Sequence, residues 1–181
     1  IFDPVNGIKD LKNKKINFIG SPDLRIQEDY LRILRFLRFS LEYNFNIKDH
    51  NIKRIINKNI KFLKFISQER LFIELKKILE LKSLFAINNK NYFKKIINQV
   101  YKIKFFERLN RVKILNEKLG LNLDYLQLLS ILLVGYDKKN IYFAREFRLS
   151  NKDKDYLNFI YEQFKLLKNK PYGYQTIRRQ L

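Results

Sequence analysis

Apolar residues recur at spacings of three and four along most of the chain from Leu24 onward, the period of amphipathic helices. The clearest case runs from Arg25 to about Tyr43. One side of that helix is apolar, with Tyr30, Ile33, Leu34, Leu37 and Leu41, and Leu31 at its edge. The other side carries charges and two aromatic residues: Arg25, Glu28, Asp29, Arg32 and Arg35, then Phe36 and Phe39. The pattern predicts one continuous helix whose polar face can form directional hydrogen bonds and stack flat rings.

A simpler interpretation of that polar face is a solvated surface. Glu28 and Arg32 are four residues apart and Asp29 and Arg32 are three apart, so both pairs can form ordinary ion pairs on a helix. Such surface pairs are common and weak, and spacing alone favours this interpretation.

The same period predicts further helices. One begins at Asp49 and continues through Ile52, Ile56 and Leu63, and another begins behind the N-cap candidate Ser67. Later helices are expected over residues 91–102, 105–119 with Gly120 as a stop, 123–134, and 152–167 with Ser150 as the cap. Pro171 and Gly173 end the pattern before a basic end with Arg178 and Arg179, and a domain boundary is expected near residues 85–90.

Residues 1–23 follow a different pattern. Asp3 to Gly7 is turn chemistry, with Asn-Gly favouring positive φ. A short helical turn over 8–14 and a short strand over 16–19 follow, and Gly20 and Pro22 end the strand. Because a single strand cannot stand alone, it should belong to a preceding domain outside this chain. The expected fold is therefore mainly α, with a short N-terminal remnant of an α/β domain.

Composition indicates a class of partner only through charge. The chain has 38 Lys and Arg against 18 Asp and Glu, a net charge of +20, which points to a polyanion such as nucleic acid. Coding by AT-rich DNA would also enrich Lys, Ile and Asn. The absence of Met and the start at Ile1 suggest a fragment.

Other residue types exclude several kinds of chemistry. There is no Cys, hence no disulfide and no Cys-ligated metal, and the one His, His50, is expected to be solvated. No apolar run approaches the roughly 20 residues of a membrane span, so we expect a soluble cytoplasmic protein. Asp153 and Asp155 have the spacing of a metal-binding pair but lie at a helix N-terminus, which explains them better.

Two milder signals remain. Glu69 and Arg70, just inside the Ser67 cap, either stabilise a helix start or brace a neighbouring element. Several aromatic residues alternate with Lys and Arg and could stack bases, although most should be core: Phe36, Phe39, Phe62, Phe65, Tyr101, Phe105 and Phe106.

Three segments in order resemble one family, the class II tRNA nucleotidyltransferases and the related bacterial poly(A) polymerases. Residues 3–11 are similar to an Asp-Pro-x-x-Gly-x-x-Asp-Leu segment, residues 28–35 to a Glu-Asp-x-x-Arg-x-x-Arg motif, and residues 67–75 to a Ser-x-Glu-Arg-x-x-x-Glu-Leu signature. The resemblance covers about residues 1–80. It implies a layout of a catalytic head (ending at residues 1–23), a helical neck (24–85) and a helical body and tail (86–181) that bind tRNA.

The resemblance also implies roles. Asp29 and Arg32 would pair with the base edge of the incoming CTP or ATP, Arg35 would contact phosphate or buttress the site, and Glu28 and Arg38 would belong to the same nucleotide-binding face. Asp29 and Arg32 would thus act as a protein template for the base. Asp3 and Gly7 would belong to a flexible segment that reorients this template, and Glu69 and Arg70 would brace the helix that carries it.

The family's catalytic Asp-x-Asp strand, which holds Mg²⁺, is absent from this chain, so the chain alone should be inactive. The resemblance favours CCA addition to tRNA 3′ ends. Poly(A) synthesis and a basic RNA-binding module without enzymatic role are the alternatives.

Overall fold

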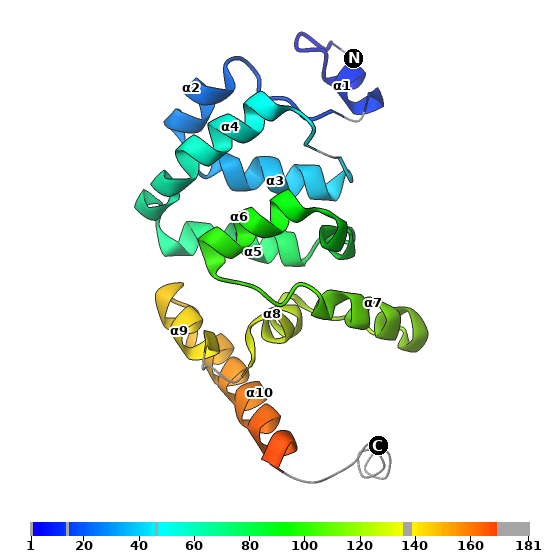
Figure 1. The fold of residues 1–181 in the computed structure, drawn as a ribbon, viewed down its shortest axis with the longest axis vertical. Coiled ribbons are helices and arrows are strands. Elements are labelled where there is room, and N and C mark those ends of the chain that lie inside the picture. Colours follow the sequence, from blue (N-terminus) through cyan, green and yellow to red (C-terminus); the bar gives the residue numbers. More distant parts are fainter. Residues whose placement is uncertain (1, 14, 46, 136–138, 170–181) are drawn as a thin grey trace.

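The computed structural model describes residues 2–13, 15–45, 47–135 and 139–169, and these form a stack of helices. Figure 1 shows the chain descending through the stack, with α1 at one end and α10 at the other. Within the described ranges there is no strand, and the elements are α1 (Gly7–Lys12), α2 (Pro22–Glu28), α3 (Arg32–Glu42), α4 (His50–Asn59), the 3₁₀ helix η1 (Ile60–Phe65), α5 (Gln68–Leu79), the 3₁₀ helix η2 (Leu84–Asn89), α6 (Asn91–Tyr101), α7 (Arg108–Leu119), α8 (Tyr125–Leu133), α9 (Lys139–Glu146) and α10 (Asn151–Asn169). The mainly α fold is confirmed.

The expected continuous helix from Arg25 to Tyr43 is wrong, because the chain breaks into α2 and α3 at Asp29. Asp29 has extended backbone angles (φ −154°, ψ 103°), and its side-chain Oδ1 accepts a hydrogen bond from the Leu31 amide at 3.1 Å. Short acidic side chains compete with helical hydrogen bonding in this way. The break sets the direction in which Asp29 and its neighbours project.

The apolar face of α3 is confirmed, with one exception. Ile33, Leu34, Leu37 and Leu41 are fully buried, and Phe39 is exposed as expected. Phe36, predicted on the polar face, is also buried, because its ring stacks on Phe18 at 5.0 Å.

The strand predicted over residues 16–19 does not form, and the contact between Phe18 and Phe36 helps to explain why. A strand requires a neighbour to satisfy its backbone groups. No described residue supplies one, and Phe18 packs against α3 instead.

Most predicted helix ends are confirmed by their capping bonds. Asp49 accepts from the amides of Asn51 and Ile52, and Ser67 accepts from the amide of Arg70. Gly120 ends α7 at φ 62°, where a side chain would be strained. Ser150 accepts from the Asp153 amide at the start of α10.

The sequence prediction missed α9 and placed the start of α7 three residues too early. The expected break at Pro171 and Gly173, the basic end with Arg178 and Arg179, and Ile1 lie outside the described residues.

A single hydrophobic cluster runs from Ile26 in α2 to Leu157 in α10. Leu84 and Ile87 of η2 belong to it, so the apolar core continues across the segment where a domain boundary is predicted. The division into three regions stays a prediction. No described helix has both the length and the apolar content needed to cross a membrane.

Candidate nucleic-acid interface

The helix break at Asp29 is the centre of a charged cluster that joins α2, α3 and α5. Asp29 Oδ2 accepts from Arg70 Nη2 at 3.0 Å and lies 3.8 Å from Arg35 Nη1. Arg70 comes from the first turn of α5, 41 residues further along the chain. The Asp29 side chain is 21% exposed, so its carboxylate is oriented by the protein while one edge still meets solvent.

Arg32, the predicted partner of Asp29, is oriented by a different carboxylate. Glu28 Oε2 lies 3.0 Å from Arg32 Nη1 and 2.6 Å from Arg25 Nη1. The Glu28–Arg32 pair of the simpler interpretation is therefore present, whereas Asp29 pairs with Arg70 and Arg35 rather than with Arg32. The two residues assigned to base reading lie at the same helix break, each held by its own partner.

Glu74 is a member of this cluster that the sequence reasoning missed. Its side chain is only 2% exposed, and its carboxylate lies 3.1 Å from Arg38 Nε, 3.6 Å from Arg35 Nε and 3.2 Å from Lys77 Nζ. A buried carboxylate of this kind requires cationic partners. The signal was available, because Glu74 falls on the inner stripe of α5 between Leu71 and Ile78.

Arg38 is more deeply placed than the other arginines of α3. Its side chain is 15% exposed, and besides Glu74 it contacts Glu42, with Nη1 3.5 Å from Oε2. Its guanidinium also lies over the ring of Phe39, 4.4 Å from the centroid. Arg38 therefore serves as a support for the cluster more than as an accessible group.

Glu69 and Arg70, predicted to brace the template helix together, contact different parts of the molecule. Arg70 contacts Asp29 directly. Glu69 instead accepts from Arg148, between α9 and α10, with Nη1 3.0 Å from Oε1. The pKa of Glu69 is lowered, first by its own backbone amide at the helix start and then by Arg148.

Asp3 and Gly7 form a local turn at the far end of the stack. Asp3 accepts from the amides of Gly7 and Ile8 at 2.8 and 2.9 Å, and Asn6 has the predicted positive φ of 57°. Among the described residues, no ion pair or side-chain hydrogen bond connects this turn to the Asp29 cluster.

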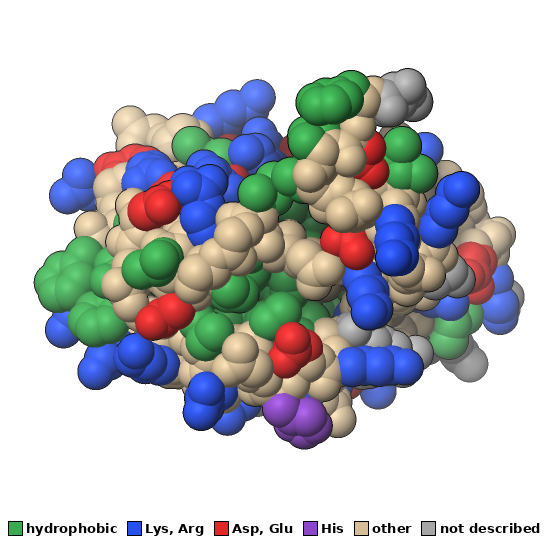
Figure 2. All heavy atoms as spheres, turned by 90° about the horizontal axis from the view of Figure 1, so that it is seen from above, with side chains coloured by type: hydrophobic (Ala, Val, Ile, Leu, Met, Phe, Trp, Pro, Cys, Tyr) green, Lys and Arg blue, Asp and Glu red, His purple; other side chains and the backbone are tan. Residues whose placement is uncertain are grey.

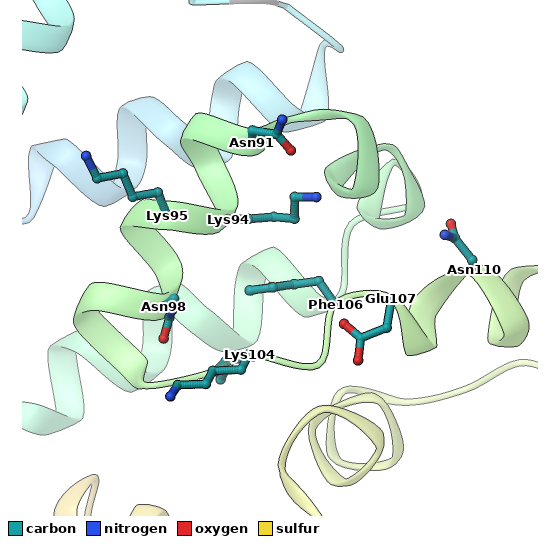
Figure 3. Close-up of a pocket in the computed structure, with 9 residues that line it drawn as sticks. Asn91, Lys94, Lys95, Asn98, Lys104, Phe106, Glu107 and Asn110 are labelled. Carbon is teal, nitrogen blue, oxygen red and sulfur yellow. The ribbon is translucent and has the colours of Figure 1, made fainter.

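A second basic surface lies between α6 and α7. The groove there has a volume of about 710 Å³. Figure 3 shows part of its lining, in which the cationic side chains are Lys94 and Lys95 on α6 and Lys104 on the connecting loop. Glu107, just before α7, and Asn110 of α7 form the opposite wall. The groove is open to solvent and carries three lysines, which suits a phosphate backbone better than a small apolar ligand.

The described residues offer no set of three His, Cys, Asp or Glu side chains that could hold a metal ion. Mg²⁺ therefore has no set of three such ligands within the described ranges. Asp153, which the sequence already argued against as a metal ligand, accepts a hydrogen bond from the hydroxyl of Tyr125 at 3.2 Å. His50 is exposed at the first position of α4.

The fold and the cluster together define a basic, helical protein with a charged face at a helix break. Over 81 residues, 44% of the chain, it is 51% identical to the mitochondrial CCA tRNA nucleotidyltransferase 1 of Mus musculus and of Homo sapiens. It is 38% identical over 78 residues to the CCA-adding enzyme of Staphylococcus saprophyticus. The chain spans about a fifth (19%) of the length of these curated relatives. No family model matches the chain.

Solved structures extend the similarity in fold over most of the chain. A tRNA-processing enzyme in an apo form covers 92% of it at a TM-score of 0.69 and 23% identity, the chain matching 50% of that structure. A Thermotoga maritima CCA-adding enzyme in complex with tRNA covers 88% at a TM-score of 0.62, with 41% of that chain matched. Part of the chain is thus similar in sequence to CCA-adding tRNA nucleotidyltransferases, and most of it shares the helical fold of the solved structures.

Proposed function

We propose that this chain acts in CCA addition to tRNA 3′ ends, as the helical part of a nucleotidyltransferase that uses CTP and ATP. The observation that carries the proposal is the helix break, where Asp29 and Arg32 are both partly exposed and each is oriented by a partner. The names of the relatives support the reaction, and their structures with ATP and with tRNA support the class of ligand.

The proposed role of Asp29 and Arg32 is to read the base of the incoming nucleotide. Each carboxylate oxygen can accept two hydrogen bonds, and Asp29 uses one on Oδ1 for Leu31 and one on Oδ2 for Arg70. A further acceptor position on each oxygen is left for an exocyclic amine, which both cytosine and adenine carry. Arg32 uses one donor for Glu28 and has others for a ring nitrogen or carbonyl. Uracil and guanine would leave buried polar groups unpaired at this edge.

The other charged residues of the cluster support this face in the proposal. Arg70 and Glu28 fix the orientation of Asp29 and Arg32. Arg35 is 43% exposed between Asp29 and Glu74, so it can both buttress the site and contact a phosphate. Asp3 and Gly7 remain predicted members of the segment that reorients the template.

The chemical step requires groups that this cluster does not supply. We expect carboxylates outside residues 1–181 to hold Mg²⁺ and to activate the 3′-hydroxyl, so that the 181-residue chain alone transfers no nucleotide. A cytoplasmic location also stays a prediction, since the mouse and human relatives are named as mitochondrial.

The test uses the intact enzyme that contains this chain, with tRNA lacking CCA, CTP and ATP. In Asp29→Ala and Arg32→Ala, discrimination against UTP and GTP and the rate of correct addition should each fall about 10- to 150-fold, the value of a hydrogen bond to a charged group. Binding of tRNA should be largely kept. Arg54→Ala, which removes an exposed arginine whose one hydrogen-bond partner among the described residues is Asn51, is the matched control.

Wild-type selectivity for C and then A in either variant would refute the base-reading assignment. A long oligo(A) product from ATP alone, without C incorporation, would assign the protein to poly(A) synthesis. Binding of tRNA by the intact protein with no nucleotide transfer would favour an RNA-binding module.

A further inference from the structure

The 3₁₀ helix η1 separates three kinds of side chain onto three edges. Its sequence, Ile-Lys-Phe-Leu-Lys-Phe, repeats with a period of three. A 3₁₀ helix has three residues per turn, so side chains three positions apart lie directly above one another. The edge of Ile60 and Leu63 is buried in the core, with 6% and 3% exposure. The other two edges, one aromatic and one cationic, face outward.

The aromatic edge continues across to the helix break. The rings of Phe62 and Phe65 stack with their centroids 6.3 Å apart and their planes 19° apart. The Phe62 ring also meets the ring of Tyr30, the residue that follows Asp29, with their centroids 5.0 Å apart. Tyr30 and the two phenylalanines of the aromatic edge thus form a ladder of rings, which leads outward from the Asp29 cluster.

The outer ring of this ladder is open to solvent. Phe65 is 70% exposed, although an exposed phenylalanine loses the benefit of burial. Figure 2 shows large hydrophobic side chains at the left margin of the molecule, on the side where α4 passes into η1, with Lys and Arg side chains beside them. An accessible ring in a basic surface is a suitable platform for a flat, uncharged group attached to an anion.

The cationic edge supplies the charge for that anion. Lys61 Nζ lies over the Phe62 ring at 5.1 Å from the centroid, and Lys64 Nζ lies over the Phe65 ring at 5.0 Å. Both lysines are exposed, and neither forms an ion pair with a described carboxylate. A long lysine side chain can leave the ring face for a phosphate and so make room for a base on the ring.

We propose that the aromatic edge of η1 binds single-stranded RNA, with a base stacked on Phe65 and the adjoining phosphates paired with Lys61 and Lys64. Stacking on an aromatic ring tolerates any base, so this site adds affinity and direction rather than sequence selectivity. The identity of the strand rests on the proposed function: a tRNA 3′ end lying along the ladder would be directed toward Asp29 and Arg32. A protein surface is the weaker occupant, because two lysines border the rings on the solvent side.

The first experiment uses a fluorescent ring at this position. Residues 1–181 contain no tryptophan, so Phe65→Trp adds an indole whose emission a stacked base quenches. The intact protein carrying this variant is titrated with the trinucleotide CCA and with an abasic ribose-phosphate trimer, and the signal of the unsubstituted protein is subtracted. We expect quenching by CCA and little by the abasic trimer. Equal response to both, or none to either, would overturn the stacking site.

The second experiment separates stacking from hydrophobic docking. Phe65→Ala should weaken binding of single-stranded RNA about 5- to 150-fold, Phe65→Tyr should keep it, and Phe65→Leu should behave like the alanine variant. Phe159→Ala is the control. It removes an exposed phenylalanine on a different helix, α10, and should leave RNA binding unchanged. Full binding by Phe65→Leu, or a fall in the thermal stability of Phe65→Ala without loss of RNA binding, would assign the ring to a protein contact and refute the proposal.

The third measurement concerns the lysines. In the double variant Lys61→Gln and Lys64→Gln, the slope of log Kd against log salt should decrease by about 1.4, since each phosphate contact on a single strand contributes about 0.7. An unchanged slope would show that neither lysine contacts a phosphate. These results are independent of catalysis: RNA binding at Phe65 in a protein without CCA addition would refute only the proposed function, and CCA addition without this binding only the stacking site.

Discussion

Charged side chains pair differently in the two halves of the described chain. In α2 to α5, Arg38 meets Glu74 and Arg70 meets Asp29 across 36 and 41 residues of sequence. In α7 and α10, the pairs Lys113–Glu117 and Lys165–Glu162 lie along single helices, with every partner about half exposed. Arg148 connects the two halves through Glu69.

The difference shows where geometry is fixed. An exposed pair along one helix contributes a few tenths of a kcal/mol and imposes no orientation on its neighbours. A carboxylate that is buried between two helices must be matched by its partners, so it locks the position of each guanidinium. The first half therefore has the rigid, oriented donors and acceptors that base reading requires.

Removal of a buried carboxylate should give the largest effect. Glu74→Ala should lower the free energy of unfolding by about 3 kcal/mol, because Arg38, which is only 15% exposed, loses its nearest carboxylate and keeps only the more distant Glu42. Urea unfolding measures this. Glu117→Ala, which removes an exposed partner of Lys113, is the control and should change stability by less than about 0.5 kcal/mol. Similar losses in the two variants would contradict the contrast between the halves.

A smaller effect is expected at Tyr101, which packs on the same side of α5. Its hydroxyl donates to the carbonyl of Leu71 at 2.7 Å, so Tyr101→Phe should lose about 1 kcal/mol at neutral pH. Burial raises the pKa of Tyr101 well above its usual value, with Glu74 adding to the shift.

The raised pKa of Tyr101 makes the free energy of unfolding depend on pH in the alkaline range. Above about pH 10 the unfolded chain releases the Tyr101 proton while the folded chain keeps it, so stability falls as pH rises. Tyr101→Phe should reduce this slope, and urea unfolding between pH 8 and 11 measures it. Tyr92 and Tyr125, with pKa values raised to about 12, leave a residual slope in the variant. An unchanged slope would show that Tyr101 ionises freely.

The smallest effect concerns the connection between the halves. Arg148→Ala removes an exposed ion pair with Glu69 and should change stability by less than about 0.5 kcal/mol. Arg148 also has a positive φ of 49°, so Arg148→Gly should be more stable than Arg148→Ala by about 1 kcal/mol. Thermal unfolding of both variants measures the difference. A large loss in each would mean that the connection holds the halves together.

Most of the helices could be predicted from the sequence because their signals are local. The apolar period and the caps at Asp49, Ser67 and Gly120 depend on residues within one or two turns. The resemblance of the segments around Asp29 and Glu69 likewise required only residue order. Short α9 was missed, and the strand over residues 16–19 was wrong because a strand is decided by a partner elsewhere.

The partners within the charged face could not be predicted. Helical spacing pairs Asp29 with Arg32, but the turn at Asp29 rotates its carboxylate toward Arg70 of α5. Phe36 was placed on the polar face, and Phe18 covers it. The period of three in η1 was visible in the sequence, yet the exposure of Phe65 depended on which edge the core buries.

The sequence by itself therefore determined a basic, mainly helical chain, its principal caps and the residues that resemble a base-reading motif. These properties arise from contacts between near neighbours. The tertiary structure alone decided that the helix breaks at Asp29, that Glu74 anchors Arg35 and Arg38, and that a ladder of rings runs from Tyr30 to Phe65. Each of these depends on packing between elements distant in sequence, where burial and charge pairing outweigh local spacing.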